Sequence, residues 1–160
     1  MNSLQYNTRK LLPSEAMLRL GSQYIGMQEI AGAEDNPVIL QMFKDIGHSW
    51  VKSEDTAWCS CFINWLAWMV KAEMSGKLDA RSWLKVGKSV SNPRIGDVVV
   101  YWRESITSWK GHVGLFMGYT RDGHIYTLGG NQGNEVDVTV YDNKRLLDFK
   151  RLSYIQVDSE

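Results

Sequence analysis

The sequence predicts an α+β fold in which N-terminal helices pack on a roughly five-stranded antiparallel sheet. Apolar residues recur at helical spacing in the first half of the 160-residue chain. The second half consists of short β-branched and aromatic runs separated by Gly, Asn and Asp. No repeat, low-complexity tract or linker interrupts the chain. Helices followed by strands around one core indicate a single α+β domain over residues 1–160.

Two helices are predicted before residue 50. Ser14 is a suitable N-cap for a helix over 15–26, whose apolar residues follow a helical period. Asn36 is expected to cap a second helix over 37–47, which starts with a proline and ends at Gly47. Both segments therefore have a start signal and an apolar stripe.

A third helix is predicted from near Cys59 to about Gly76, and a short helical turn over 81–87 follows it. Beyond that turn the pattern changes to strands. The five predicted strands cover 96–102, 111–120, 124–130, 135–142 and 149–157.

Both cysteines of the chain lie at the start of the third predicted helix. Because residues two apart point roughly 200° away from each other on a helix, Cys59 and Cys61 cannot share a zinc or redox site. With Asp55 or Thr56 as the cap, Cys59 falls near the first turn, where free N–H groups and the helix dipole favour a thiolate. Cys59 is therefore a candidate nucleophile or a buried core residue, and Cys61 a small core residue.

A thiolate catalyst needs a proton acceptor, and the chain has three histidines. His48 lies in a loop and is expected at the surface, while His124 opens a strand at a half-exposed position. His112 starts the strand 111–120 with a glycine on either side, at 111 and 114, which allows close approach of another group. His112 is thus the candidate general base, although a lone histidine is more often structural.

The predicted hairpin around residues 121–123 brings a polar residue beside His112. One turn geometry places Asn131 opposite His112, and a shift to an Asp-Gly turn places Gly133 there instead. Asn131 is a candidate to orient the imidazole, or a loop residue chosen because asparagine tolerates left-handed backbone geometry.

Four motifs in order, "WCSCFINW", "NPRIGDVVVYW", "GHVGLFMGY" and "LGGNQ", resemble the cysteine-histidine peptidases and amidases that include the CHAP and NlpC/P60 domains. The resemblance covers roughly residues 15–155. It implies a papain-like core with Cys59 as nucleophile, His112 as general base and Asn131 as the third residue. Many CHAP enzymes have a carboxylate two residues before the asparagine, where this chain has Gly129.

The same resemblance implies a peptidoglycan substrate and acyl-transfer chemistry without a cofactor or a metal. The amide bond to be cut would lie in the stem peptide or be the N-acetylmuramoyl-L-alanine bond. Backbone N–H groups at the start of the third helix, including that of Cys59, would hold the oxyanion. Asp55 or Thr56 could add to this hole, with Asp55 also a candidate substrate contact.

Tryptophans suggest where a substrate could lie. Trp102 and Trp109 bracket a loop between two strands, and aromatic faces on such a loop suit sugar or peptide contacts. A place at the edge of the core is at least as good an interpretation for Trp102. Four further tryptophans are expected to be packing residues because of their helical spacing: Trp58, Trp65, Trp68 and Trp83.

Three other functions fit parts of the sequence. An acyltransferase could use the same cysteine and histidine, and product identity would distinguish it from a hydrolase. A non-catalytic wall-binding or carbohydrate-binding module would use the tryptophans and need no thiolate. A Cys-x-Cys metal or redox protein is the weakest alternative, because of the helical geometry.

Charge and hydropathy exclude several partners. Eighteen basic and eighteen acidic residues give a net charge of zero, which disfavours nucleic acid. No apolar run is long enough for membrane insertion, and residues 1–17 do not resemble a signal peptide.

We expect a monomer made in the cytoplasm that reaches the periplasm or cell wall by export, injection or phage lysis. A phage endolysin or a secreted antibacterial effector fits, with a secretion or lysis carrier or an immunity protein as partner.

Overall fold

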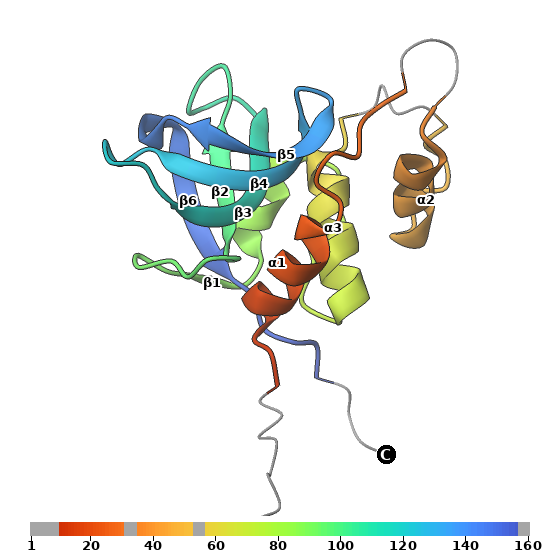
Figure 1. Cartoon of the computed structure of the whole chain (residues 1–160), viewed down its shortest axis with the longest axis horizontal. Coiled ribbons are helices and arrows are strands. Elements are labelled where there is room, and N and C mark those ends of the chain that lie inside the picture. Colours follow the sequence, from red (N-terminus) through yellow and green to blue (C-terminus); the bar gives the residue numbers. More distant parts are fainter. Residues whose placement is uncertain (1–9, 31–34, 53–56, 157–160) are drawn as a thin grey trace, which may run out of the picture.

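The computed structural model describes residues 10–30, 35–52 and 57–156. Three α-helices come first, and Figure 1 shows α3 lying against the sheet, with α1 and α2 packed on α3. The helices are α1 (Pro13–Ser22), α2 (Pro37–Asp45) and α3 (Cys59–Val70), followed by the 3-10 helix η1 (Ala80–Lys85). The strands are β1 (Lys88–Ser89), β2 (Val98–Trp102), β3 (Gly111–Tyr119), β4 (Ile125–Gln132), β5 (Glu135–Tyr141) and β6 (Leu146–Arg151), and the 3-10 helix η2 (Asn143–Arg145) precedes β6.

The strands form one sheet in the order β1-β6-β2-β3-β4-β5, and every described pair is antiparallel. This confirms the predicted α+β architecture. The sheet has six strands because the two-residue strand β1 pairs with β6, a contact too short to leave a sequence pattern. Strand β6 spans 146–151 and not the predicted 149–157.

Helix starts follow the local chemistry. Asn36 caps α2 as predicted, because its side-chain oxygen accepts a hydrogen bond from the Val38 N–H at 2.9 Å. Helix α1 begins at Pro13, so the predicted cap Ser14 is wrong and lies inside the first turn. Proline has the backbone angle that a first helical residue needs, and the N-cap is Leu12.

The third helix begins at Cys59, with Trp58 as its N-cap. The predicted caps Asp55 and Thr56 lie outside the described residues. The helix ends at Val70 and not near Gly76, because Lys71 adopts a left-handed conformation with φ 63°.

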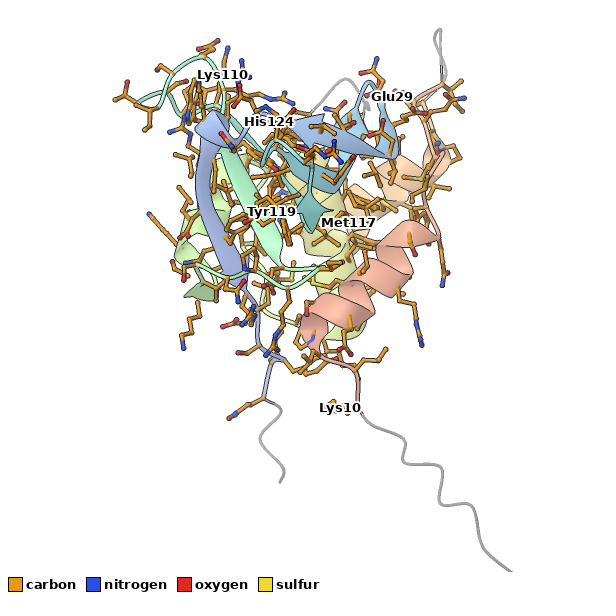
Figure 2. All side chains as sticks on the ribbon, turned by 60° about the vertical axis from the view of Figure 1, so that its left-hand side comes forward. Lys10, Glu29, Lys110, Met117, Tyr119 and His124 are labelled. Carbon is orange, nitrogen blue, oxygen red and sulfur yellow. The ribbon has the colours of Figure 1, made fainter. Side chains whose placement is uncertain are left out.

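Strand β2 is buried on both faces. Val98 and Val100 pack in the core between the sheet and the helices, while Val99 and Tyr101 belong to a second apolar cluster. Alternate residues of a strand point to opposite faces of the sheet. The continuous apolar sequence of β2 therefore reflects two cores, one on each face. Next to it, β3 runs from the loop that contains Lys110 to Tyr119, and Figure 2 shows these two residues well apart along the sheet.

The Gly-Asp pair before β2 has a structural role. Asp97 is 1% exposed, and its carboxylate binds the Arg151 guanidinium at 2.7 Å and the Arg94 N–H at 2.8 Å. A side chain at Gly96, where φ is +96°, would collide with the backbone of Ser14. The pair thus fixes β2 against both β6 and α1.

Most of the tryptophans predicted to pack in the core do so. Trp58, Trp65 and Trp83 are buried, which confirms the prediction for them. Trp68 is 44% exposed, so that prediction is wrong for this residue. It lies near the end of α3, where it lines a surface pocket together with Met74 and Ile155.

Candidate functional site

Cys59 is the first residue of α3 and is 6% exposed. Its sulfur lies against β3, where the backbone N–H of Val113 is directed at it together with those of Ser60 and Cys59 itself. Burial raises the pKa of the thiol, and these N–H groups and the charge of Arg103 oppose that rise. The helix start supplies donors for a thiolate, while the resting thiol is protonated.

His112, the residue before Val113, is fully buried, and its Nε2 lies 2.9 Å from Oε1 of Gln132. The Gln132 nitrogen donates to the Thr127 carbonyl at 3.2 Å, to the Asp137 carbonyl at 3.0 Å and to Asp137 Oδ1 at 2.6 Å. Since this nitrogen faces acceptors, the amide oxygen must accept, and His112 Nε2 is the donor. This assignment leaves Nδ1 of His112 with the free lone pair.

The imidazole of His112 is neutral near pH 7. Burial lowers its pKa to about 4, and the charge of Arg103 lowers it further, while Gln132 and Asp137 act in the opposite direction. The ring is stacked on Tyr141, with 4.9 Å between ring centroids and 16° between planes. The ring is therefore unprotonated and held in one orientation, which are two of the conditions for a general base.

Arg103 follows the last residue of β2 and is exposed. Its guanidinium nitrogen lies 3.4 Å from Nδ1 of His112. The same guanidinium also acts on Tyr141. Burial raises the pKa of Tyr141 to about 12, and the charge of Arg103 and its hydrogen bond to Tyr141 oppose this rise. Sequence reasoning missed this residue, because an arginine at a strand end is common on protein surfaces.

A bulge in β4 decides which polar side chain meets His112. Leu115 pairs with Leu128, the register that would place residue 131 opposite His112. The pairing with β5 then shifts between Gly129 and Gln132, and Asn131 adopts a left-handed φ of 57°. This turn directs the next residue, Gln132, to the imidazole, and the described hydrogen bonds of His112 do not include Asn131.

Gly129 leaves the space that Gln132 uses. A Cβ atom at this position would lie 2.5 Å from Oε1 of Gln132 and 3.2 Å from Nε2 of His112. The amide oxygen of Gln132 therefore stands where a side chain at 129 would begin. The sequence signal for this contact is a glutamine directly after "GGN", followed five residues later by Asp137.

Trp102 and Trp109 have different surroundings. Trp109 is 71% exposed on the loop between β2 and β3. Trp102 is half-buried, its Nε1 donates to the Lys144 carbonyl at 3.1 Å, and Arg145 lies over its ring at 5.3 Å. Asp55, the third predicted substrate contact, is outside the described residues.

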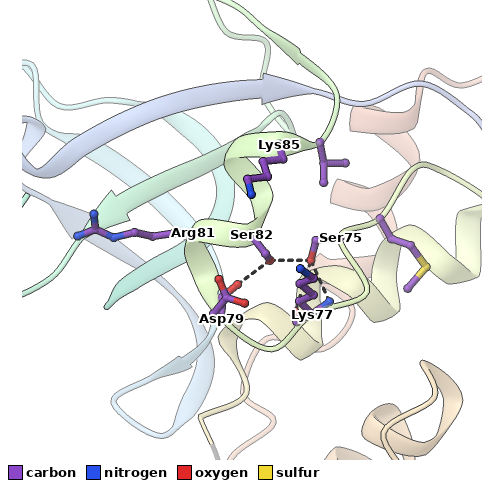
Figure 3. A pocket seen from close by; sticks show the side chains of 8 residues that line it. Ser75, Lys77, Asp79, Arg81, Ser82 and Lys85 are labelled. Atoms are coloured by element: carbon purple, nitrogen blue, oxygen red, sulfur yellow. Dashed lines mark hydrogen bonds between the residues drawn. The ribbon is translucent and has the colours of Figure 1, made fainter. Parts of the chain in front are cut away.

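Arg81 of η1 holds the loop that contains Trp109. Its guanidinium donates to the carbonyls of Lys110, Ile106 and Ser105 at 2.8, 2.7 and 2.8 Å. Figure 3 shows the guanidinium of Arg81, which lines the drawn pocket, pointing away from Ser82 and Ser75, where Ser82 donates to Ser75. The loop beside the candidate site therefore has a fixed backbone.

The other reactive groups lie apart from this site. Cys61 is buried and reduced, and burial raises its pKa. His48 is half-buried, with Nε2 2.8 Å from the Gly76 carbonyl, and His124 is half-exposed near Asp142. Within the described ranges, no cluster of three His, Cys, Asp or Glu side chains could hold a metal ion.

Comparison with known proteins identifies the family of this chain. The sequence model of the CHAP domain matches residues 51–131, about half of the chain, and includes both Cys59 and His112. A search of curated proteins gives no match. The described helices include none that is long and apolar enough to cross a membrane.

Two solved structures with TM-scores above 0.5 have the same fold. NlpC1 from Trichomonas vaginalis has a TM-score of 0.56 at 15% identity, covering 92% of this chain and 48% of that protein. A mutant of the Resuscitation Promoting Factor Interacting protein RipA has a TM-score of 0.51 at 18% identity, covering 89% of this chain and 63% of that one. RipD from Mycobacterium tuberculosis, a non-catalytic NlpC/p60 domain protein, has a TM-score of 0.47 at 17% identity and is covered over its full length. The chain thus spans about half to two thirds of the first two.

Proposed function

Because this chain belongs to the CHAP domain family, we propose that it is a peptidoglycan hydrolase with cysteine nucleophilic catalysis. The family assignment by itself suggests a cell-wall hydrolase or a peptidoglycan-binding protein. The bond to be cut is an amide of the stem peptide or the N-acetylmuramoyl-L-alanine bond. No cofactor is part of the proposal.

Two observations carry the proposal: a helix-terminal thiol that faces the backbone N–H of Val113, and an oriented imidazole on the preceding residue, His112. Cys59 lies against β3 at Val113, and Gln132 holds Nε2 of the His112 ring so that Nδ1 is the nitrogen with the lone pair. We propose that this lone pair serves Cys59. A base held by a second hydrogen bond next to a nucleophile is the geometry that acyl transfer requires.

The reaction starts from a neutral pair. Nδ1 of His112 accepts the proton of Cys59 as the sulfur bonds to the carbonyl carbon of the substrate. The tetrahedral intermediate collapses, the C–N bond breaks, and His112 returns the proton to the leaving amine. Water then attacks the thioester, His112 takes a proton from it, and the C–S bond breaks to release the acid and restore the thiol.

The start of α3 stabilises the negative charge that develops in this reaction. The first N–H groups of a helix lack intrahelical partners, and those of Cys59 and Ser60 are directed toward the sulfur. The carbonyl oxygen of a bound substrate would lie near these donors as it becomes an oxyanion. Asp55 and Thr56 remain proposals for a side-chain donor, with Asp55 also a proposed substrate contact.

We propose that the substrate binds on the face bordered by the loop between β2 and β3. Trp109 and Ile106 are 71% and 65% exposed there, on a backbone that Arg81 fixes. Exposed aromatic and apolar side chains on a rigid loop suit contacts with a glycopeptide. Trp102 has a weaker claim, because one side of its ring is covered by Arg145.

The proposed setting is the cell wall. A phage endolysin and an injected antibacterial effector both meet peptidoglycan there, and an immunity protein would be the partner in the second case. The two settings share the same chemistry at Cys59.

Digestion of purified peptidoglycan tests the proposal. The wild-type protein should release soluble fragments, Cys59→Ala should release none, and Cys61→Ala should retain activity as the matched control. Mass spectrometry of the new termini names the bond that is cut. Equal fragments from wild type and Cys59→Ala would contradict the proposal, and empty digests with retention on the pelleted wall would indicate a binding protein instead.

A further inference from the structure

Arg103 is a charged side chain next to the reacting groups that the proposed reaction does not use. It is exposed, and none of the described carboxylates forms an ion pair with its guanidinium. Two other arginines are bound to acceptors of the fold, since Arg81 donates to three carbonyls and Arg151 binds Asp97. The guanidinium of Arg103 reaches His112 and Tyr141, and its remaining donors face the solvent at the site.

The position of Arg103 affects the base directly. One of its nitrogens donates toward Nδ1 of His112 at 3.4 Å, the atom that must accept the proton of Cys59. While this contact persists, the lone pair of Nδ1 is occupied. The catalytic pair can therefore work once Arg103 turns away.

Only the side chain has to move. The backbone N–H of Arg103 donates to the Lys110 carbonyl at 3.2 Å, and Arg81 holds the same loop through Ser105 and Ile106. A fixed backbone with an exposed, flexible arginine permits a change of rotamer without a change of fold.

We propose that Arg103 binds a carboxylate of the substrate close to the scissile bond, and that this ion pair draws its guanidinium away from Nδ1 of His112. A guanidinium is planar and matches a carboxylate with two parallel, charge-assisted hydrogen bonds. These are stronger than its long contact with one ring nitrogen and its hydrogen bond to the neutral Tyr141 hydroxyl. The substrate class is therefore a peptide whose residue next to the cleaved amide has a free carboxylate. This inference rests on the proposed hydrolase function.

The test uses two synthetic stem-peptide fragments that differ in one group, a free carboxylate or a carboxamide beside the scissile amide. The wild-type protein should cleave the carboxylate form with a kcat/KM about tenfold to a hundredfold higher. Arg103→Met should bring the ratio of the two rates close to one, and Arg103→Glu should invert it by repelling the carboxylate. Arg121→Met should keep the wild-type ratio.

Arg121 is a matched control because it is an exposed arginine beyond the other end of β3. Arg121 comes two residues after Tyr119, the last residue of β3. Figure 2 shows Tyr119 well apart from Lys110, which precedes the other end of β3, where His112 lies. A general loss of positive charge would affect both arginine variants, whereas a local carboxylate contact affects Arg103 variants alone.

The outcomes separate this inference from the proposed function. If wild type cleaves neither fragment, nor peptidoglycan, the hydrolase proposal fails. If wild type cleaves both forms equally, or Arg103→Met keeps the preference, the role of Arg103 is wrong and the hydrolase stands. Should Arg103→Met lose all turnover, binding of the two fragments to Cys59→Ala and to Cys59→Ala/Arg103→Met decides. Selective binding by the first protein alone supports the inference, and equal selectivity of both overturns it.

Discussion

Oε1 of Gln132 accepts a hydrogen bond from Nε2 of His112 at 2.9 Å, while the nitrogen of the same amide donates to Asp137 at 2.6 Å. The amide thus connects the imidazole to a carboxylate without bringing the two into contact. Because the amide nitrogen is held by Asp137 and by the Thr127 carbonyl, the oxygen has to face the histidine. This relationship fixes both the tautomer and the orientation of the base.

Removing this amide should reduce catalysis more than folding. Gln132→Ala releases His112, and the loss of one hydrogen bond worth about 1–1.5 kcal/mol in the transition state corresponds to roughly a tenfold lower kcat. Asn131→Gly is the matched comparison, since glycine tolerates the φ of 57° at this position. Steady-state rates of the two variants on a peptide substrate give the result, and a larger loss in Asn131→Gly would restore Asn131 as the third residue.

A methyl group at Gly129 should also act through Gln132. The Cβ of Gly129→Ala would lie 2.5 Å from Oε1 of Gln132, so the amide has to leave its place on the imidazole. We expect a loss of kcat similar to that of Gln132→Ala, and the double variant should lose little more than either single one. If the fold-loss of kcat in the double variant equals the product of the two single losses, the two residues act independently.

The depressed pKa of His112 makes stability depend on pH. Above pH 6.5 the imidazole is neutral in both the folded and the unfolded state and contributes nothing. Between about pH 6.5 and 4 the unfolded chain binds a proton that the folded chain excludes, so the free energy of unfolding falls as the pH falls, by up to about 3 kcal/mol. Urea unfolding at pH 7 and pH 4.5 should show a larger loss for wild type than for His112→Gln.

If wild type and His112→Gln lose the same stability between these two pH values, the imidazole is not protected from protonation. Direct titration of the His112 ring by NMR gives a second readout. Arg103→Met should raise the pKa of this ring, because the arginine charge lowers it in the wild type.

The two cysteines should respond to serine in opposite ways. Cys61 is 1% exposed, so a hydroxyl there without a partner should lower the free energy of unfolding by about 1–3 kcal/mol. Cys59→Ser should change stability less, since backbone N–H groups around position 59 can bind the hydroxyl, while turnover should be abolished. Denaturant melts and rate assays on the same preparations check both statements, and an active Cys59→Ser would contradict the assigned nucleophile.

The fold could be predicted largely from apolar periodicity. The helices at 13–22, 37–45 and 59–70 and the strands from 98 onward follow patterns that their burial explains. What escaped prediction depends on tertiary contact. The strand β1 exists because β6 lies beside it, and α3 ends at Lys71 because a single residue changes its backbone conformation.

The candidate site could be predicted in part. The sequence predicts Cys59 near a helix start and His112 at a strand start, and both residues lie there in the structure. The contact of Gln132 with the imidazole depends on a bulge that shifts the facing residue by one, and one residue is within the error of any hairpin register. The position of Arg103 depends on a side-chain rotamer, which no sequence pattern determines.

The most direct test of the account is to trap the acyl-enzyme. Wild-type protein mixed with a stem-peptide substrate, quenched in acid and digested, should show the mass of the acyl fragment on the peptide that contains Cys59 and Cys61, and fragmentation should place it on Cys59. The adduct should be absent from Cys59→Ala and present in Cys61→Ala. Substrate cleavage by Cys59→Ala, or an adduct on Cys61, would contradict the central claim that Cys59 is the nucleophile and His112 its base.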